Sequence, residues 1–204
     1  MDIYTLLPEG FGSNCYILAL GRSAAVVDPS VNASEILAFL SDKGLKLELI
    51  LLTHGHFDHI ESLDSLRDVT MAPACIHKDD NEMLTDGKKN AYEFFFGYGK
   101  KWRPAERLLE NGDILTLGDE TIEVISTPGH SRGSVCLLCG DKLITGDTLF
   151  ANGFGRYDLH GGDVNQLADS IASLRTLDRN LTIYPGHGDS ARLSAALDRV
   201  AYYF

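Results

Sequence analysis

The chain lacks a long apolar run: none of its hydrophobic stretches approaches the roughly 18 residues that a membrane helix needs. Its opening segment, MDIYTLLPEG, has neither a basic start nor an extended apolar stretch, so we expect no secretory signal peptide. It has only four cysteines in 204 residues, too few for the disulfide framework of a small secreted protein. These absences favour a cytoplasmic protein without a membrane anchor.

The two cysteines of the segment CLLC have a spacing that is found in metal sites, but a second pair is lacking. Cys136 and Cys139 lie in a strand-like run, where side chains three positions apart point to opposite faces. We therefore expect ordinary packing for both thiols.

Positive charge is also scarce. The chain has 18 Lys and Arg residues against 29 Asp and Glu, a formal net charge of -11. This net charge argues against non-specific nucleic-acid binding, although a bound metal or a local arginine would still allow anionic small substrates. Proline- and serine-rich linkers and short repeats are absent, so residues 1–204 are expected to form a single domain with a substantial core.

Strand-like and helix-like segments occur in both halves of the chain, which predicts an α/β fold with two sheets covered by outer helices, a four-layer arrangement. The expected strands are 3–7, 14–20, 24–28, 47–53, 113–118, 121–127, 134–140, 142–147 and 181–187. The expected helices are 32–44, 59–68, 163–177 and 190–204, with a short one at 78–86. The aromatic segment 90–102 is expected to be a loop or an irregular helix.

The segment LLTHGHFDHI places three histidines and an aspartate directly after an apolar strand. His54 and His56 are two positions apart, so both rings can point the same way in an extended or tightly turned segment. Asp58 and His59 follow where the chain enters the next helix. Imidazole and carboxylate together suit zinc, iron or manganese, so this run predicts a metal site.

Three further segments repeat the pattern of a potential ligand at a strand exit. TPGHS contains His130, ITGDT contains Asp147, and YPGHG contains His187, each beside a glycine that lets the backbone turn closely. Two of the seven histidines lie outside these motifs: His77, expected at a strand end, and His160, expected as a polar loop residue.

In this order, THGHFDH, TPGHS, ITGDT and YPGHG resemble the motifs of the metallo-β-lactamase superfamily over nearly the whole chain. The segment GDTLFANGFGRYDLHGGD is similar to the glyoxalase II (hydroxyacylglutathione hydrolase-like) branch and its short relatives. The resemblance implies an αβ/βα sandwich that binds two divalent metal ions, zinc as first choice, with iron or manganese as alternatives. The implied ligands are His54, His56 and His130 for one ion, Asp58, His59 and His187 for the other, and Asp147 for both.

Together with the dinuclear site, the resemblance to the glyoxalase II branch implies hydrolysis of a thioester, such as S-lactoylglutathione or another small acyl thioester, by a metal-bridging hydroxide. Asp58 is then also the candidate catalytic residue, because it can orient the attacking water or accept its proton. The alternatives are a persulfide dioxygenase with a single iron on His54, His130 and Asp147, and a lactonase or other ester hydrolase. We expect residues 1–204 to lack the basic C-terminal helical region of full-length glyoxalase II, and therefore to recognise glutathione weakly.

Two segments are candidates for substrate specificity. Arg156, with its neighbour Tyr157, lies shortly after the metal-binding aspartate and could pair with a substrate carboxylate. Alternatively, Arg156 forms a salt bridge to Asp158 that fixes the loop. The aromatic residues of 92–102 either line a pocket or pack as a surface excursion.

Overall fold

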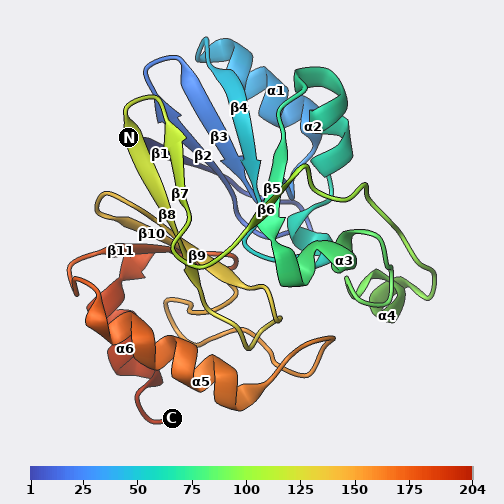
Figure 1. Ribbon diagram of the computed structural model, residues 1–204. Helices are drawn as coiled ribbons and strands as arrows, with labels where there is room; N and C mark the ends of the chain where they lie inside the picture. Colours follow the sequence, from blue (N-terminus) through green and yellow to red (C-terminus); the bar gives the residue numbers. More distant parts are fainter. Residues whose placement is uncertain (204) are drawn as a thin grey trace.

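The computed structural model describes residues 1–203, in which two six-stranded sheets face each other (Figure 1). The first sheet has the order β1-β2-β3-β4-β5-β6, and the second has the order β12-β11-β10-β9-β8-β7. The strands of the first sheet are Asp2–Leu6, Cys15–Leu20, Ser23–Val27, Lys46–Leu51, Ala74–His77 and Arg107–Leu109. Those of the second, β7 to β12, are Ile114–Leu117, Glu120–Ser126, Val135–Cys139, Lys142–Gly146, Thr182–Pro185 and Ala191–Arg192.

Helices cover the outer face of each sheet (Figure 1). The longer ones are α1 (Ala33–Asp42) and α2 (Leu63–Thr70) on the first sheet and α5 (Val164–Ser173) and α6 (Leu193–Val200) on the second. The short helices α3 (Asn81–Leu84) and α4 (Tyr92–Phe96) lie in the excursion between β5 and β6, and 3-10 turns occupy Phe57–His59, Lys78–Asp80 and Leu174–Thr176. No helix within residues 1–203 is both long and apolar enough to cross a membrane.

Alternating side chains of the strands divide the core into three layers. In β2, Ile17 packs toward α1 and α2, whereas its neighbour Leu18 packs between the two sheets. In the second sheet, Val124 joins the layer between the sheets, and Ile183 packs against α5 and α6. Helix, sheet, sheet and helix thus stack as four layers, which confirms the predicted fold class.

The cysteines of CLLC follow the same alternation. Cys136 lies in the layer beneath α5 and α6, and Cys139 lies between the sheets. Both are free thiols and fully buried. Their side chains therefore pack on opposite faces of β9, as the strand periodicity predicts.

Several element boundaries differ from the expectation. The helix predicted from residue 59 is a 3-10 turn at Phe57–His59 followed by α2 from Leu63, because His59 is held in the site rather than in a regular helix. The predicted final helix is shorter, since Ala191–Arg192 pair with β11 before α6 begins; residue 204 of that prediction lies outside the described residues. Strands β6 and β12 were not predicted, and β5 was expected only through His77 at its end; each has at most four residues, too few for a periodic pattern.

Candidate metal centre

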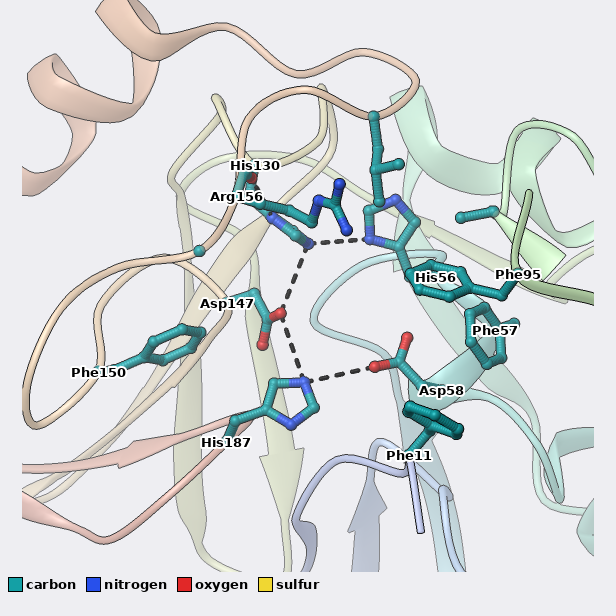
Figure 2. A pocket seen from close by; sticks show the side chains of 13 residues that line it. Phe11, His56, Phe57, Asp58, Phe95, His130, Asp147, Phe150, Arg156 and His187 are labelled. Atoms are coloured by element: carbon teal, nitrogen blue, oxygen red, sulfur yellow. Dashed lines mark hydrogen bonds and ion pairs between the residues drawn. The ribbon is translucent and has the colours of Figure 1, made fainter.

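The predicted ligands meet at one edge of the sandwich, although four different strands supply them. Residues 54–59 follow β4, His130 follows β8, Asp147 follows β10 and His187 follows β11. The parallel pairing of β10 with β11 brings the carboxyl ends of these two strands to the same edge. Figure 2 shows side chains from all four exits pointing into one small volume.

His54, His56 and His130 form the first cluster of potential ligands. Nδ1 of His56 lies 2.9 Å from Nε2 of His130, which in turn lies 3.2 Å from Nε2 of His54. All three side chains are buried, and their ring nitrogens lie within 4.8 Å of one another. Three imidazoles that face each other across so short a distance leave room for a shared cation.

The second cluster consists of Asp58, His59 and His187. Oδ2 of Asp58 lies 3.3 Å from Nε2 of His187 and 3.9 Å from Nε2 of His59. Asp147 stands between the clusters. Its Oδ1 lies 3.4 Å from Nε2 of His59, and its Oδ2 lies 3.6 Å from Nε2 of both His130 and His187. One carboxylate therefore reaches histidines of both clusters.

The donor atoms of the two clusters fit divalent metal ions. Within residues 1–203, Nε2 of His59 and Oδ1 of Asp147 are buried without a hydrogen-bond partner. Such orphaned polar atoms are uncommon in folded proteins and call for a ligand or an ion. A set of imidazoles and carboxylates is what zinc and neighbouring transition metals bind.

The pKa values of the histidines also favour the binding of metal ions. Burial lowers the pKa of His54, and it lowers that of His56 to about 3, with further contributions from neighbouring histidines, so both rings are neutral and keep a free lone pair. Around His59, burial lowers the pKa, but three carboxylates outweigh it, Asp147 most strongly, and raise the pKa well above its usual range. One imidazolium thus faces three carboxylates, those of Asp28, Asp58 and Asp147, and this excess of negative charge attracts a cation.

Asp28, at the end of β3, orients residues of the second cluster and of the histidine run. Its Oδ1 accepts a 2.8 Å hydrogen bond from the backbone N–H of Thr53, and its Oδ2 accepts one of 2.6 Å from the Thr53 hydroxyl. The same Oδ2 lies 2.8 Å from Nδ1 of His59. A carboxylate at Nδ1 directs the other ring nitrogen toward the centre, as supporting partners of metal-binding histidines do.

Asp80, which is fully buried, connects the two loops of the first cluster. Its Oδ2 accepts hydrogen bonds of 2.6 Å from the hydroxyl of Ser131 and 3.2 Å from the backbone N–H of Gly55, and its Oδ1 accepts one of 2.7 Å from the N–H of Gly133. Gly55 separates the first two histidines of the run, and Ser131 follows His130. Asp80 thereby fixes the loop backbones on both sides of this cluster.

Glycines beside the ligands are required by close approach. A Cβ on Gly186 would lie 2.2 Å from Oδ1 of Asp147 and 2.7 Å from Cε1 of His59. A Cβ on Gly129 would lie 2.2 Å from the backbone N of Leu167, and its φ of +131° is a conformation open to glycine. The glycines of the two Pro-Gly-His segments thus allow the chain after β8 and β11 to pass close to its neighbours, so that His130 and His187 reach the site.

A cavity of about 270 Å³ opens beside the clusters, and Figure 2 shows how its aromatic walls surround them. Besides cluster residues, it is lined by four phenylalanines, Phe11, Phe57, Phe95 and Phe150. Phe95 belongs to the aromatic segment 92–102, whereas Trp102 of that segment packs into the core beneath the first sheet. Both roles considered for the segment therefore occur in it.

Arg156 lines the same cavity, and its side chain is paired. Its Nε and Nη2 donate to Oδ1 and Oδ2 of Asp158 at 2.7 and 2.8 Å. Its carbonyl oxygen lies 2.6 Å from Nδ1 of His130, which fixes the orientation of that ring. Tyr157 is 43% exposed and, among the described residues, does not line this cavity. Substrate binding by Arg156 and Tyr157 stays a prediction.

The remaining two histidines lie outside the clusters. His77 ends β5, as predicted, and its Nδ1 accepts a 3.3 Å hydrogen bond from the backbone N–H of Asp79. His160 lies in a loop, with Nε2 3.4 Å from Oε1 of Glu82.

Residues 8–187 match the family model of the metallo-beta-lactamase superfamily. This chain belongs to that superfamily. The probable metallo-hydrolase YqgX of Bacillus subtilis is 36% identical over 179 residues, which cover 86% of this chain and 85% of the relative. Two solved structures are also similar: BLEG-1, a B3 metallo-beta-lactamase, with 33% identity, a TM-score of 0.92 and 97% of both chains covered; and TTHA1623 in a di-iron-bound form, with 30% identity, a TM-score of 0.82 and 96% of both chains covered.

The seven residues that the motifs indicate as ligands lie close together in the structure. Their roles as ligands stay predictions. The narrower likeness to glyoxalase II stays a prediction as well. The sequence interpretation missed two supporting residues. Asp28 had a signal, since it closes the apolar strand AAVVD, but Asp80 lies in an ordinary polar segment and had none.

Proposed function

We propose that this chain is a hydrolase that uses two divalent metal ions to cleave thioesters. The observation that carries the proposal is the position of Asp147, whose carboxylate lies within 3.6 Å of histidines from both clusters, at the wall of a cavity. A single carboxylate between two ligand clusters is the arrangement that a dinuclear site needs. Relatives described as probable metallo-hydrolases support the hydrolytic class.

In this proposal each cluster holds one ion and Asp147 contributes to both. The first ion is held by His54, His56 and His130, the second by Asp58, His59 and His187. Zinc is the first choice because this donor set suits it at a hydrolytic centre. Iron or manganese would fit the same donors.

With two ions bound, the site would supply a water of lowered pKa and would polarise the substrate carbonyl. The protein's own residues prepare that chemistry. Burial opposes ionisation of Asp58, but His59 and His187 outweigh it and lower the pKa of this carboxyl, so it is anionic near neutral pH and can orient the attacking water or accept its proton. The carbonyl of Arg156 holds the ring of His130 in one orientation.

Thioesters are the proposed substrates because GDTLFANGFGRYDLHGGD, which contains Asp147 and Arg156, is similar to the glyoxalase II branch. A thiolate leaves readily, so the site requires no strong general acid for the leaving group. Hydrolysis of β-lactams is a second candidate, supported by the 33% identity to BLEG-1 over nearly the whole chain.

The test is a turnover screen on protein loaded with zinc, iron or manganese, with metal content measured on the same sample. The panel contains thioesters, lactones and β-lactams, and oxygen uptake with glutathione persulfide is followed in parallel. We expect thioester turnover with near two metals per chain. Turnover of β-lactams or lactones alone would replace the thioester proposal. Oxygen consumption with one iron per chain would assign a dioxygenase instead.

A further inference from the structure

The cavity beside the metal centre has an apolar character that the ligand clusters do not require. Phe57 is packed by its aromatic neighbours, with ring centroids 5.4 Å from Phe95 and 5.5 Å from Tyr92. Phe11 lies on the same side of the site as Phe57, and Phe150 lies across the clusters from them (Figure 2). An apolar wall beside a polar catalytic centre stabilises the part of a substrate that leaves water when it binds.

The positive charge in this wall is already paired. Among the described lining residues, Arg156 is the only lysine or arginine, and Asp158 binds its guanidinium through two hydrogen bonds. The guanidinium also lies over the rings of Phe94 and Phe95, at 5.9 and 6.0 Å from their centroids. Arg156 thus braces the aromatic wall, and its charge is balanced without a substrate carboxylate.

The volume of the cavity also limits which substrate group it can hold. Pockets that enclose a drug-sized ligand have volumes of about 300–1,000 Å³, whereas this cavity has about 270 Å³. A tripeptide thiol such as glutathione carries two carboxylates and finds no unpaired lysine or arginine in the described lining. A compact uncharged group fits the volume of the cavity and its apolar lining.

We infer that the cavity is an acyl pocket, which takes the uncharged apolar acyl group of a thioester while the thiol portion lies toward solvent. This inference rests on the proposed thioester hydrolysis and names its substrate class. Phe95 is the specificity-determining residue. It lines the cavity from α4 and is partly exposed, whereas Phe57 is buried and lies between two predicted ligands, His56 and Asp58.

The kinetic test uses straight-chain acyl thioesters from acetyl to hexanoyl, each on the small neutral thiol N-acetylcysteamine and on glutathione. For the metal-loaded parent, kcat/KM should rise about fourfold per added methylene, as expected for burial of each CH₂. The glutathione thioesters should show the same dependence of kcat/KM on acyl length, and their kcat/KM should not exceed that of the N-acetylcysteamine thioesters. In Phe95→Ala, the hexanoyl-to-acetyl ratio should fall on the order of tenfold, mainly through KM.

The matched control is Tyr202→Ala, which truncates an aromatic side chain that is 94% exposed and does not line the cavity. It should keep the parent ratio. A parent ratio near one, or a ratio that Phe95→Ala leaves unchanged, would overturn the acyl pocket. A strong preference for glutathione thioesters whatever their acyl group would also overturn it.

A binding measurement separates this inference from the proposed function. Calorimetry of acetate and hexanoate on the metal-loaded protein compares two monocarboxylates that differ only in the apolar tail. The parent and Tyr202→Ala should bind hexanoate at least about tenfold more tightly, and Phe95→Ala should lose most of that difference. If no thioester is cleaved but hexanoate binds more tightly than acetate in the parent and not in Phe95→Ala, the proposed reaction is wrong and the assignment of the apolar pocket is supported. If thioesters are cleaved without any such preference, the reaction stands and the pocket fails.

Discussion

Oδ2 of Asp80 accepts a 2.6 Å hydrogen bond from the hydroxyl of Ser131, the residue that follows His130. The same carboxylate binds the backbone between His54 and His56, so one buried group holds both loops of the first cluster. Its ionised form is stabilised by hydrogen bonds from hydroxyl and backbone donors, while burial raises its pKa above the usual range.

Replacement of Asp80 by asparagine should weaken metal binding at the first cluster. The amide NH₂ of Asp80→Asn would face at least one of the donors that now bind the carboxylate, and leaving buried donors unpaired costs about 1–3 kcal/mol in the free energy of unfolding. We expect the metal content to fall from two toward one per chain. Elemental analysis and urea denaturation measure both effects. Asp79→Asn, which changes an adjacent carboxylate that is 51% exposed, should change neither; equal metal content in all three proteins would contradict this role.

Replacement of Asp147 by alanine should remove metal from both clusters at once. Its Oδ1 lies nearest to His59 of the second cluster, and its Oδ2 lies near His130 of the first cluster and His187 of the second. We expect Asp147→Ala to bind less than one metal per chain and to lose more activity than the 10–100-fold typical of a supporting residue. The control Asp141→Ala removes a carboxylate that is 82% exposed. A variant of Asp147 with both metals and full turnover would exclude the bridging role.

Chelation should destabilise the protein and reloading should restore it. Without metal, the like charges of Asp58 and Asp147 repel each other, and buried atoms of His59 and Asp147 lack hydrogen-bond partners among residues 1–203. Binding to the folded state alone stabilises by about 4 kcal/mol when free metal is a thousandfold above its Kd. Thermal melting before and after treatment with a chelator, and after addition of zinc, measures the change. An unchanged melting temperature and no metal uptake would exclude a metal centre.

Arg156→Ala should reduce kcat/KM by a similar factor for an anionic and a neutral thioester. Its guanidinium is already held by Asp158, so its loss should loosen the aromatic wall and the carbonyl that orients His130 for every substrate alike. The comparison uses hexanoyl thioesters of glutathione and of N-acetylcysteamine. A loss confined to the glutathione substrate would instead show that Arg156 leaves Asp158 and binds a substrate carboxylate.

The four cysteines should be unreactive in the folded protein. Burial raises the pKa of the Cys75 and Cys139 thiols to about 11 and that of Cys136 to about 12, and it raises the pKa of Cys15 further. A thiol whose pKa is raised in the fold stabilises the fold below the unfolded pKa of about 8.5, and that contribution is lost as the pH rises above it. Titration with Ellman's reagent at about pH 8 should detect four thiols only after denaturation. Fast reaction of any thiol in the folded protein would contradict this packing.

Features of this protein that depend on short-range patterns could be predicted from the amino-acid sequence alone. Alternation along strands separates Cys136 from Cys139, and apolar spacing places α1 between Asn32 and Gly44. The run from His54 to His59 is visible because its residues are adjacent in the chain. A potential ligand at the end of a strand can be recognised from the sequence, because strand and turn patterns span only a few consecutive residues.

The residues that support the site from distant parts of the chain became visible only in the folded structure. Asp28 lies 31 positions from His59, and Asp80 lies 51 positions from Ser131; no local pattern joins such pairs. The same holds for β6, whose three residues pair with β5, and for Phe95, which α4 brings to the cavity wall beside Phe57. These features depend on which side chains meet when the sheets pack. Packing is a property of the whole fold, because each contact requires the backbone of both partners to be fixed first.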